Sequence, residues 1–138
     1  MNLSFFDGFQ DEYLQKPQGR GVFLAGVALG CMAACQVENE SKIKDAPLFK
    51  QIQFGRLDMK NLRRFLARLP QLEAAYAEAV NNRKLYQLSF LAAEADRLML
   101  EGGAKELGVD GNFAFTAGFG NAIRYYWQIF KKEDKEEQ

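Results

Sequence analysis

Hydrophobic residues recur with helical spacing along most of the chain, and the pattern is clearest between residues 58 and 70. The apolar residues of this stretch lie at i, i+3, i+4 and i+7, namely Leu62, Phe65, Leu66 and Leu69. That spacing places their side chains on one face of an α-helix, and Asp58 is suited to cap the first turn. Strand-like alternation of apolar and polar residues does not persist anywhere in the sequence. The pattern therefore predicts an all-α protein.

Proline and polar residues divide the N-terminal half into further elements. A short helix over residues 3–15 is predicted to end before Pro17, and a Gly- and Ala-rich helix follows over residues 19–38. The polar segment 38–47 is typical of a loop. Pro47 is either the stop of that loop or the first residue of a short helix.

The C-terminal half contains three further helical patterns, over residues 71–80, 82–101 and 110–132. Pro70 ends, kinks or restarts the helix that leads into the first of them. The glycines at 102–103 close the second, and Asp110 is suited to cap the third. We therefore expect five or six helices in a compact bundle, as one domain over residues 1–132. The charged segment 133–138 is expected to be a disordered tail.

Two of the predicted helices supply many of the expected core residues. One face of the 82–101 helix carries Leu85, Leu88, Ala92, Ala95 and Met99. The last helix is expected to contribute Phe113, Phe119, Ile123, Tyr126 and Phe130. Tyr125 and Trp127 are the aromatic residues that we expect to face a groove or a partner.

The segment 21–35, GVFLAGVALGCMAAC, is the one candidate for a membrane element. It is shorter than the roughly 20 apolar residues that a spanning helix needs and is rich in Gly and Ala, so we interpret it as a soluble core helix. Gly26 and Gly30 are spaced to let a neighbouring helix approach closely. Cys31 and Cys35 share a helical face at a separation unsuited to a disulfide, and we expect both to be small buried residues.

Charge is distributed unevenly although the chain has a formal net charge of +0 at pH 7. From Lys42 to Arg68 there are eight basic and two acidic residues, a net +6, so the rest of the chain carries −6. With Leu62 at zero on a helical wheel, five basic residues fall between about 100° and 240°, opposite the apolar stripe: Arg56, Lys60, Arg63, Arg64 and Arg68. Such a charge distribution is expected where one surface binds a polyanion through contacts that salt weakens.

A second interpretation of these arginines stays open, in which they pair with acids from elsewhere in the fold and only solvate an outer helix face. No acidic residue lies four positions from any of them within the helix itself. That absence favours a binding function over an internally paired surface.

The side chain that enzymes most often use as a general base is missing. The chain has no histidine, which removes the usual general base near neutral pH and every Ser-His or Cys-His arrangement. The segment 118–123, GFGNAI, has two glycines of a dinucleotide fingerprint but no preceding strand and no third glycine. Glu94, Asp96 and Glu101 are expected to form a solvated face with Arg97 as a partner. We therefore expect a non-enzymatic protein with no cofactor and no metal.

Four segments that together span most of residues 19–130 are informative as a set: FLAGVALGCMAACQ at 23–36, PLFKQI at 47–52, LSFLAAEADRLML at 88–100 and FAFTAGFGNAIRYYW at 113–127. Their order resembles the small subunit of a CRISPR Cascade effector, in particular the type I-B small subunit, whose sequence matches the C-terminal part of that system's large subunit. The resemblance implies an all-helical, cytoplasmic protein without a membrane segment, present in several copies along a crRNA-bearing backbone. It also implies contacts with the displaced non-target strand, with crRNA or target DNA in the complex, and with backbone subunits, large subunits and further copies of itself.

The basic helix suits this role because strand exchange is close to energetically balanced, so modest backbone contacts can stabilise a displaced strand. We predict nucleic-acid contacts from Arg56, Lys60, Arg63, Arg64 and Arg68, with Lys50, Arg83, Lys84 and Arg124 as further candidates. Tyr125 and Trp127 are candidates for base stacking. Weak binding by the isolated chain, strengthened by several copies, is expected from the neutral overall charge. The alternative is a helical adaptor whose basic face docks an acidic protein.

Overall fold

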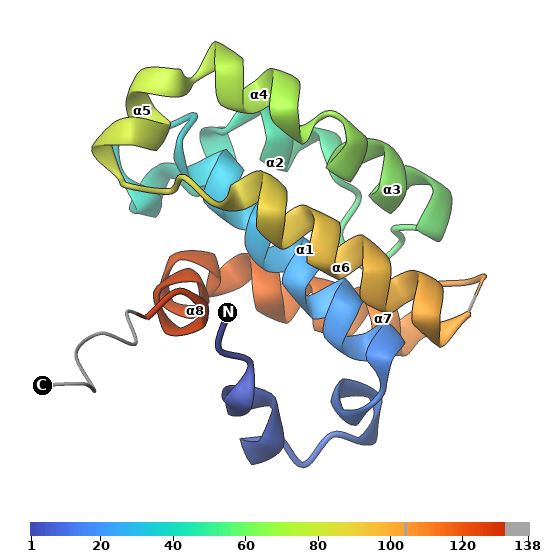
Figure 1. The fold of residues 1–138 in the computed structure, drawn as a ribbon. Coiled ribbons are helices and arrows are strands. Elements are labelled where there is room, and N and C mark those ends of the chain that lie inside the picture. The colour runs from blue at the N-terminus through green and yellow to red at the C-terminus, as the bar shows by residue number, and fades with distance from the viewer. Residues whose placement is uncertain (104, 132–138) are drawn as a thin grey trace, which may run out of the picture.

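The computed structural model describes residues 1–103 and 105–131, and this part of the chain is helical without any β-strand (Figure 1). The predicted all-α class is therefore confirmed. Eight α-helices and three short 3-10 helices make up the described part, so the prediction of five or six helices is too low. In chain order they are η1 (Ser4–Gly8), η2 (Glu12–Gln15), α1 (Pro17–Ala34), η3 (Glu40–Asp45), α2 (Pro47–Gln51), α3 (Met59–Ala67), α4 (Leu69–Ala75), α5 (Ala77–Asn82), α6 (Leu88–Gly102), α7 (Gly108–Gly120) and α8 (Ala122–Ile129). The predicted tail over 133–138 and the predicted helix end at Lys132 lie outside the described residues.

The additional helices arise from interruptions within predicted long ones. Arg68 ends α3, and Pro70 lies at the start of α4, where its missing N–H leaves no hydrogen bond unmade. Tyr76, with φ −116° and ψ 33°, separates α4 from α5. Asn121, with φ −123° and ψ 27°, separates α7 from α8. Its side-chain amide donates a 3.0 Å hydrogen bond to the carbonyl of Ala117, a side-chain contact that competes with the helical ladder.

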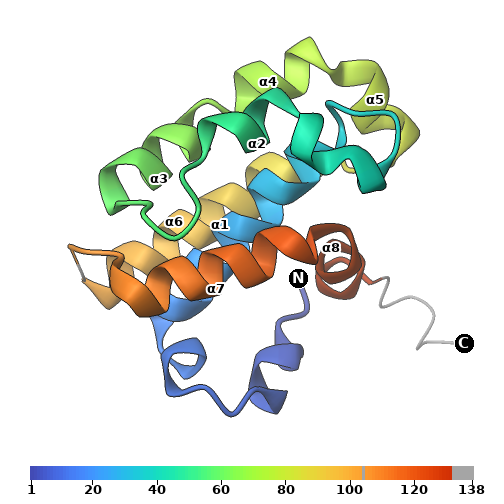
Figure 2. The same cartoon turned by 180° about the vertical axis from the view of Figure 1, so that it is seen from behind.

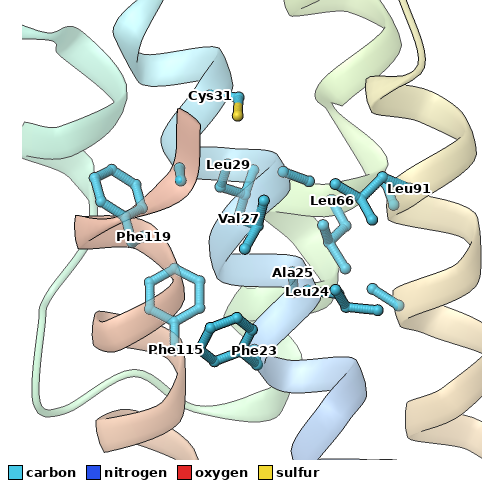
Figure 3. Packing of buried hydrophobic residues seen from close by; sticks show 14 of the residues in the cluster. Phe23, Leu24, Ala25, Val27, Leu29, Cys31, Leu66, Leu91, Phe115 and Phe119 are labelled. Carbon is cyan, nitrogen blue, oxygen red and sulfur yellow. The ribbon is translucent and has the colours of Figure 1, made fainter. Parts of the chain in front are cut away.

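Helix α1 is the centre of the fold and lies between α6 and α7 (Figures 1 and 2). Every residue from Gly21 to Cys35 is buried, which confirms this segment as a core helix. Figure 3 shows Phe115 and Phe119 of α7 on one side of α1 and Leu91 of α6 on the other. Among the described residues, no helix combines the length and the apolarity that crossing a lipid bilayer requires.

Glycines allow the close approach of these three helices. A Cβ atom at Gly26 would overlap the carbonyl oxygen of Phe115 on α7, and one at Gly30 would lie 2.6 Å from the carbonyl oxygen of Phe119. The interpretation of this glycine pair as a helix-packing site is confirmed. The contact is reciprocal, because a Cβ at Gly118 of α7 would overlap the carbonyl oxygen of Phe23 on α1.

A second layer, built from α2 to α5, covers one side of the α1 and α6 pair in both views (Figures 1 and 2). The stripe predicted for α3 faces this core: Leu62, Leu66 and Leu69 are buried and Phe65 is partly buried. The apolar face predicted around α6 is also confirmed, with all five of its residues buried: Leu85, Leu88, Ala92, Ala95 and Met99.

The aromatic residues of the last two helices are placed differently from the prediction. Phe119 and Tyr126 are buried as expected, but Phe113 is 74% exposed and Tyr125 only 8%. The Tyr125 ring lies 4.9 Å from that of Phe23, within a cluster to which η1 contributes. The two predictions are wrong because they place the buried side of these helices incorrectly. Phe113 lies about 200° around α7 from the buried Phe115, whereas Tyr125 shares one face of α8 with the buried Ala122 and Ile129.

The predicted ends and cysteines can also be compared with the structure. Gly103, with φ 68°, is the left-handed residue that ends α6, as predicted. Asp110 lies inside the first turn of α7, so its prediction as the cap is wrong. Cys31 and Cys35 are buried free thiols, as predicted, and burial raises the pKa of both.

Candidate nucleic-acid interface

The candidate interface is the outward side of α3 and of the loop before it, and we define the basic surface by its five residues: Arg56, Lys60, Arg63, Arg64 and Arg68. Helix α3 begins at an Asp58 cap, whose Oδ1 accepts the main-chain N–H of Asn61 at 2.7 Å. The buried Leu62 and Leu66 fix which side of the helix faces the core. The helix therefore presents its cations on the surface.

Three of the five basic residues, Arg56, Lys60 and Arg64, are exposed. Within residues 1–103 and 105–131, none of the three takes part in an ion pair. Their charge is therefore not neutralised by the described part of the fold, and it is available to an external anion.

The other two basic residues are tied to neighbouring helices. Arg63 Nε lies 3.8 Å from Asp96 Oδ1 of α6, so the interpretation in which arginines pair with distant acids is correct for this residue. Arg68 Nη1 donates a 2.8 Å hydrogen bond to Gln51 Oε1 of α2, a neutral partner that leaves the positive charge in place. Lys50, the residue before Gln51, is exposed, so α2 adds a cation beside the end of α3.

The remaining three predicted contact residues lie elsewhere. Arg83 and Lys84 follow α5, and Arg124 is on α8; both helices are at the opposite end of the molecule from α3 in the two views (Figures 1 and 2). Arg83 Nη1 lies 3.6 Å from Glu40 Oε1, which joins the end of α5 to η3. The structure therefore does not bring these three residues together with the basic surface.

The loop that carries Arg56 is held to α7 by an asparagine that the sequence analysis did not single out. Asn112 is buried; its Oδ1 accepts the main-chain N–H of Leu57 at 2.7 Å, and its Nδ2 donates to the Leu57 carbonyl at 2.9 Å. Gly55, with φ 85°, makes the turn just before this clamp. The sequence signal for this contact is an amide side chain on an otherwise apolar helix face, because a buried amide needs hydrogen-bond partners.

Exposed aromatic residues are the other side chains of interest, because they can stack on bases. Phe113 of α7 lies beside the Asn112 clamp, and a shallow, mainly apolar pocket lies there, lined by Gly55, Val109, Asn112, Phe113, Thr116 and Ala117. Of the two residues predicted for base stacking, Trp127 is 44% exposed on α8 and Tyr125 is buried. Burial removes Tyr125 from the candidates.

The carboxylates of α6 are paired with arginines. Arg97 Nη2 lies 2.7 Å from Glu94 Oε2, and Arg97 Nη1 lies 3.2 Å from Glu101 Oε2. The hydrogen bond from Arg97 lowers the pKa of Glu94. This is the arrangement expected for a solvated helix face. In the described ranges no three Asp, Glu, Cys or His side chains gather as metal ligands do.

The fold and the basic surface define a small all-helical domain with one cationic side. Residues 2–133 match the family model of the C-terminal domain of CRISPR-associated protein TM1802 (cas_TM1802), so the chain belongs to this CRISPR-associated family. No curated protein and no solved structure matches the chain. The resemblance to a CRISPR-associated protein is thereby confirmed at the level of the family.

Proposed function

We propose that this chain is a non-catalytic small subunit of a type I-B CRISPR Cascade surveillance complex. In this role it contacts the displaced non-target strand and the backbone subunits, and it stabilises the R-loop. The observation that carries the proposal is the exposure of Arg56, Lys60 and Arg64, the part of the basic surface that forms no ion pair among the described residues, on a chain that belongs to a CRISPR-associated family. The absence of histidine from the sequence favours a role without catalysis.

The physical argument starts from the energetics of strand exchange. The RNA–DNA heteroduplex is about as stable as the DNA duplex that it replaces, so small contributions from protein–backbone contacts decide whether the R-loop persists. Lysine and arginine contacts to phosphate are independent of sequence, which suits a subunit that serves many targets. The formal net charge of +0 keeps the affinity of one copy low, and several copies on one strand raise it.

The direct test is chemical probing of the displaced strand. An effector complex is assembled with and without the chain on a target whose non-target strand is rich in thymine, and permanganate reactivity of the unpaired thymines is measured. We expect the wild-type chain to reduce reactivity, because bound bases are shielded. A variant with Arg56→Gln, Lys60→Gln and Arg64→Gln should leave the strand as reactive as in the complex without the chain.

The matched control changes three exposed cations at the other end of the molecule that are not predicted contacts, Lys42→Gln, Lys44→Gln and Lys131→Gln. It removes the same charge, so protection of the strand should survive. A chain that joins the complex but leaves every thymine reactive would contradict the proposal and favour the protein adaptor.

A further inference from the structure

We infer that Phe113 stacks against a base of single-stranded DNA, so that the DNA track runs from the basic surface across the residue 52–58 loop onto α7. The inference rests on the proposed function and extends it by naming an aromatic contact and the pocket that holds the base. It assigns to α7 a role that charge alone does not identify.

Phe113 is unusual because it is a large apolar side chain without a partner in the described part of the chain. It is 74% exposed, and Val109, one turn before it, is 85% exposed. The opposite side of α7 is used fully by the core, where Phe115 and Phe119 pack against α1 (Figure 3). The exposure of Phe113 is therefore not a result of poor packing of α7. Proteins that bind single-stranded DNA use exposed aromatic side chains as platforms on which bases stack.

The pocket beside Phe113 is also lined by the loop that carries a cation. Gly55 and Phe113 line the same shallow pocket, and Arg56 is the residue that follows Gly55. The two hydrogen bonds between Asn112 and Leu57 hold this loop against α7, so the main chain that carries the exposed Arg56 is held beside the pocket. A bound nucleotide would stack its base on Phe113 and place its phosphate near Arg56.

The charges around the pocket favour a nucleic acid over an apolar protein segment. Arg56 follows Gly55, which lines the pocket, and Lys60 lies at the start of α3. Two acids lie close by: Asp110, three positions before Phe113 and about 60° around α7 from it, and Asp58, whose carboxylate caps α3. Among the described residues, four cations of the basic surface take part in no ion pair and outnumber these two acids, so the side of the pocket toward α3 stays positive.

Trp127, the exposed aromatic residue that the sequence analysis proposed for base stacking, does not lie beside the basic surface. The cation one turn before it, Arg124, lies over the Tyr125 ring, 4.8 Å from the ring centroid. The Trp127 ring packs edge-on against Tyr126 at 5.1 Å, and it lies on α8, away from α3 in both views (Figures 1 and 2). Trp127 is also the single tryptophan of the chain, which makes it an internal control.

The test uses two proteins that each contain one tryptophan. The first is wild type, which reports from Trp127, and the second combines Phe113→Trp with Trp127→Phe, which reports from position 113. Oligo(dT) is titrated into each, binding is followed by anisotropy of a label on the DNA, and stacking is followed by quenching of tryptophan fluorescence. We expect quenching at position 113 and none at Trp127.

Two further substitutions of Phe113, made with Trp127 left in place, separate aromatic stacking from nonspecific apolar contact. Phe113→Ala is expected to weaken oligo(dT) binding about tenfold without changing its salt slope, because stacking releases no counterions. Phe113→Leu retains apolar area but has no aromatic face, and it should behave like the alanine variant. Both side chains replace an exposed ring, so both proteins should keep wild-type helicity.

Each contrary result has a distinct meaning. Binding without quenching at position 113, or equal quenching at both positions, would overturn the inference and leave the proposed function standing. No binding by wild type would overturn both. Wild-type DNA affinity in Phe113→Leu, together with lost incorporation of Phe113→Ala into the effector complex, would overturn stacking and show that α7 docks a protein.

Discussion

Arg63 and Asp96 form the ion pair that joins α3 to α6, with Arg63 Nε 3.8 Å from Asp96 Oδ1. The same Nε is shielded from solvent and has no hydrogen-bond partner within the described residues. One of the five cations of the basic surface is therefore directed toward a neighbouring helix. The ion pair divides the surface into a partly neutralised edge and an exposed part that contains Arg64.

Removing the acid of this pair should strengthen DNA binding. Asp96→Asn releases the charge of Arg63, so we expect tighter binding of oligo(dT) at low salt and a log–log salt slope that is steeper by about 0.7, the value for one added phosphate contact on a single strand. The side chains of Arg63 and Asp96 are 40% and 48% exposed, so the free energy of unfolding should change by less than about 1 kcal/mol.

The matched control is Glu101→Gln, which removes one acid from the same helix but leaves Arg63 paired. It should tighten binding less than Asp96→Asn does. Equal effects of the two substitutions would mean that only the net charge matters, and would contradict a specific role for the ion pair.

The glycine contacts between α1 and α7 predict a large difference between two neighbouring substitutions. A Cβ at Gly118 would overlap the Phe23 carbonyl, whereas a Cβ at Gly120 meets nothing within 4 Å. Gly118→Ala should lower the free energy of unfolding by about 1–3 kcal/mol or more, because helices α1 and α7 must separate. Gly120→Ala should be neutral or stabilise by up to about 1 kcal/mol. Urea unfolding followed by circular dichroism measures both, and equal losses would contradict the packing account.

The Asn112 clamp predicts a local effect on the loop that carries Arg56. Asn112→Ala leaves the N–H and carbonyl of Leu57 without their partners, so we expect a loss of roughly 2 kcal/mol in stability and faster hydrogen exchange at the Leu57 amide. Thr116→Ala, an exposed position on the same helix, is the control and should change neither quantity. Unchanged exchange at Leu57 in the Asn112 variant would contradict the clamp.

Burial of Tyr126 predicts a loss of stability at alkaline pH. Burial raises its pKa above the ordinary 10.0, and the phenol oxygen accepts the N–H of Gln87 at 3.1 Å. The neutral phenol therefore stabilises the fold in full below pH 10.0, and this contribution is lost as the pH rises through the raised pKa. Tyr126→Phe should be less stable than wild type near neutral pH because the hydrogen bond is lost.

The measurement for this prediction is urea unfolding at a series of values between about pH 8 and about pH 11. The stability of wild type should fall more steeply over this interval than that of the phenylalanine variant. Parallel curves for the two proteins would mean that Tyr126 does not contribute to the alkaline loss.

Much of the fold could be predicted because the relevant signals are local. The stripe around Leu62, the cap at Asp58 and the glycine that ends α6 each depend on a few neighbouring residues, and each is found where it was predicted. The glycine pair at 26 and 30 could be predicted as a helix-packing site because two small residues four positions apart let another helix approach closely.

The errors arise where a long-range contact decides the outcome. Phe113 and Tyr125 exchange their predicted environments because aromatic residues occur on all sides of α7 and α8, so the sequence pattern does not reveal which of them faces α1. The pairing of Arg83 with Glu40 could not be predicted either, because it depends on how α5 meets η3. The Asn112 clamp joins residues 55 positions apart, whereas a helical wheel relates only residues of one helix.

The most direct test of the central claim is the salt dependence of oligo(dT) binding by the wild-type chain and two triple variants. The first variant, with glutamine at positions 56, 60 and 64, removes the exposed cations of the basic surface. The second, with glutamine at positions 42, 44 and 131, removes the same charge at the other end of the molecule. Fluorescence anisotropy is recorded across a salt series after helicity has been checked. We predict that binding by wild type and by the second variant weakens with salt, whereas the first variant binds more weakly and with a slope shallower by about 0.7 per lost contact. Equal affinity and slope in all three proteins, or no binding by wild type at low salt, would contradict the claim that this surface holds a displaced strand.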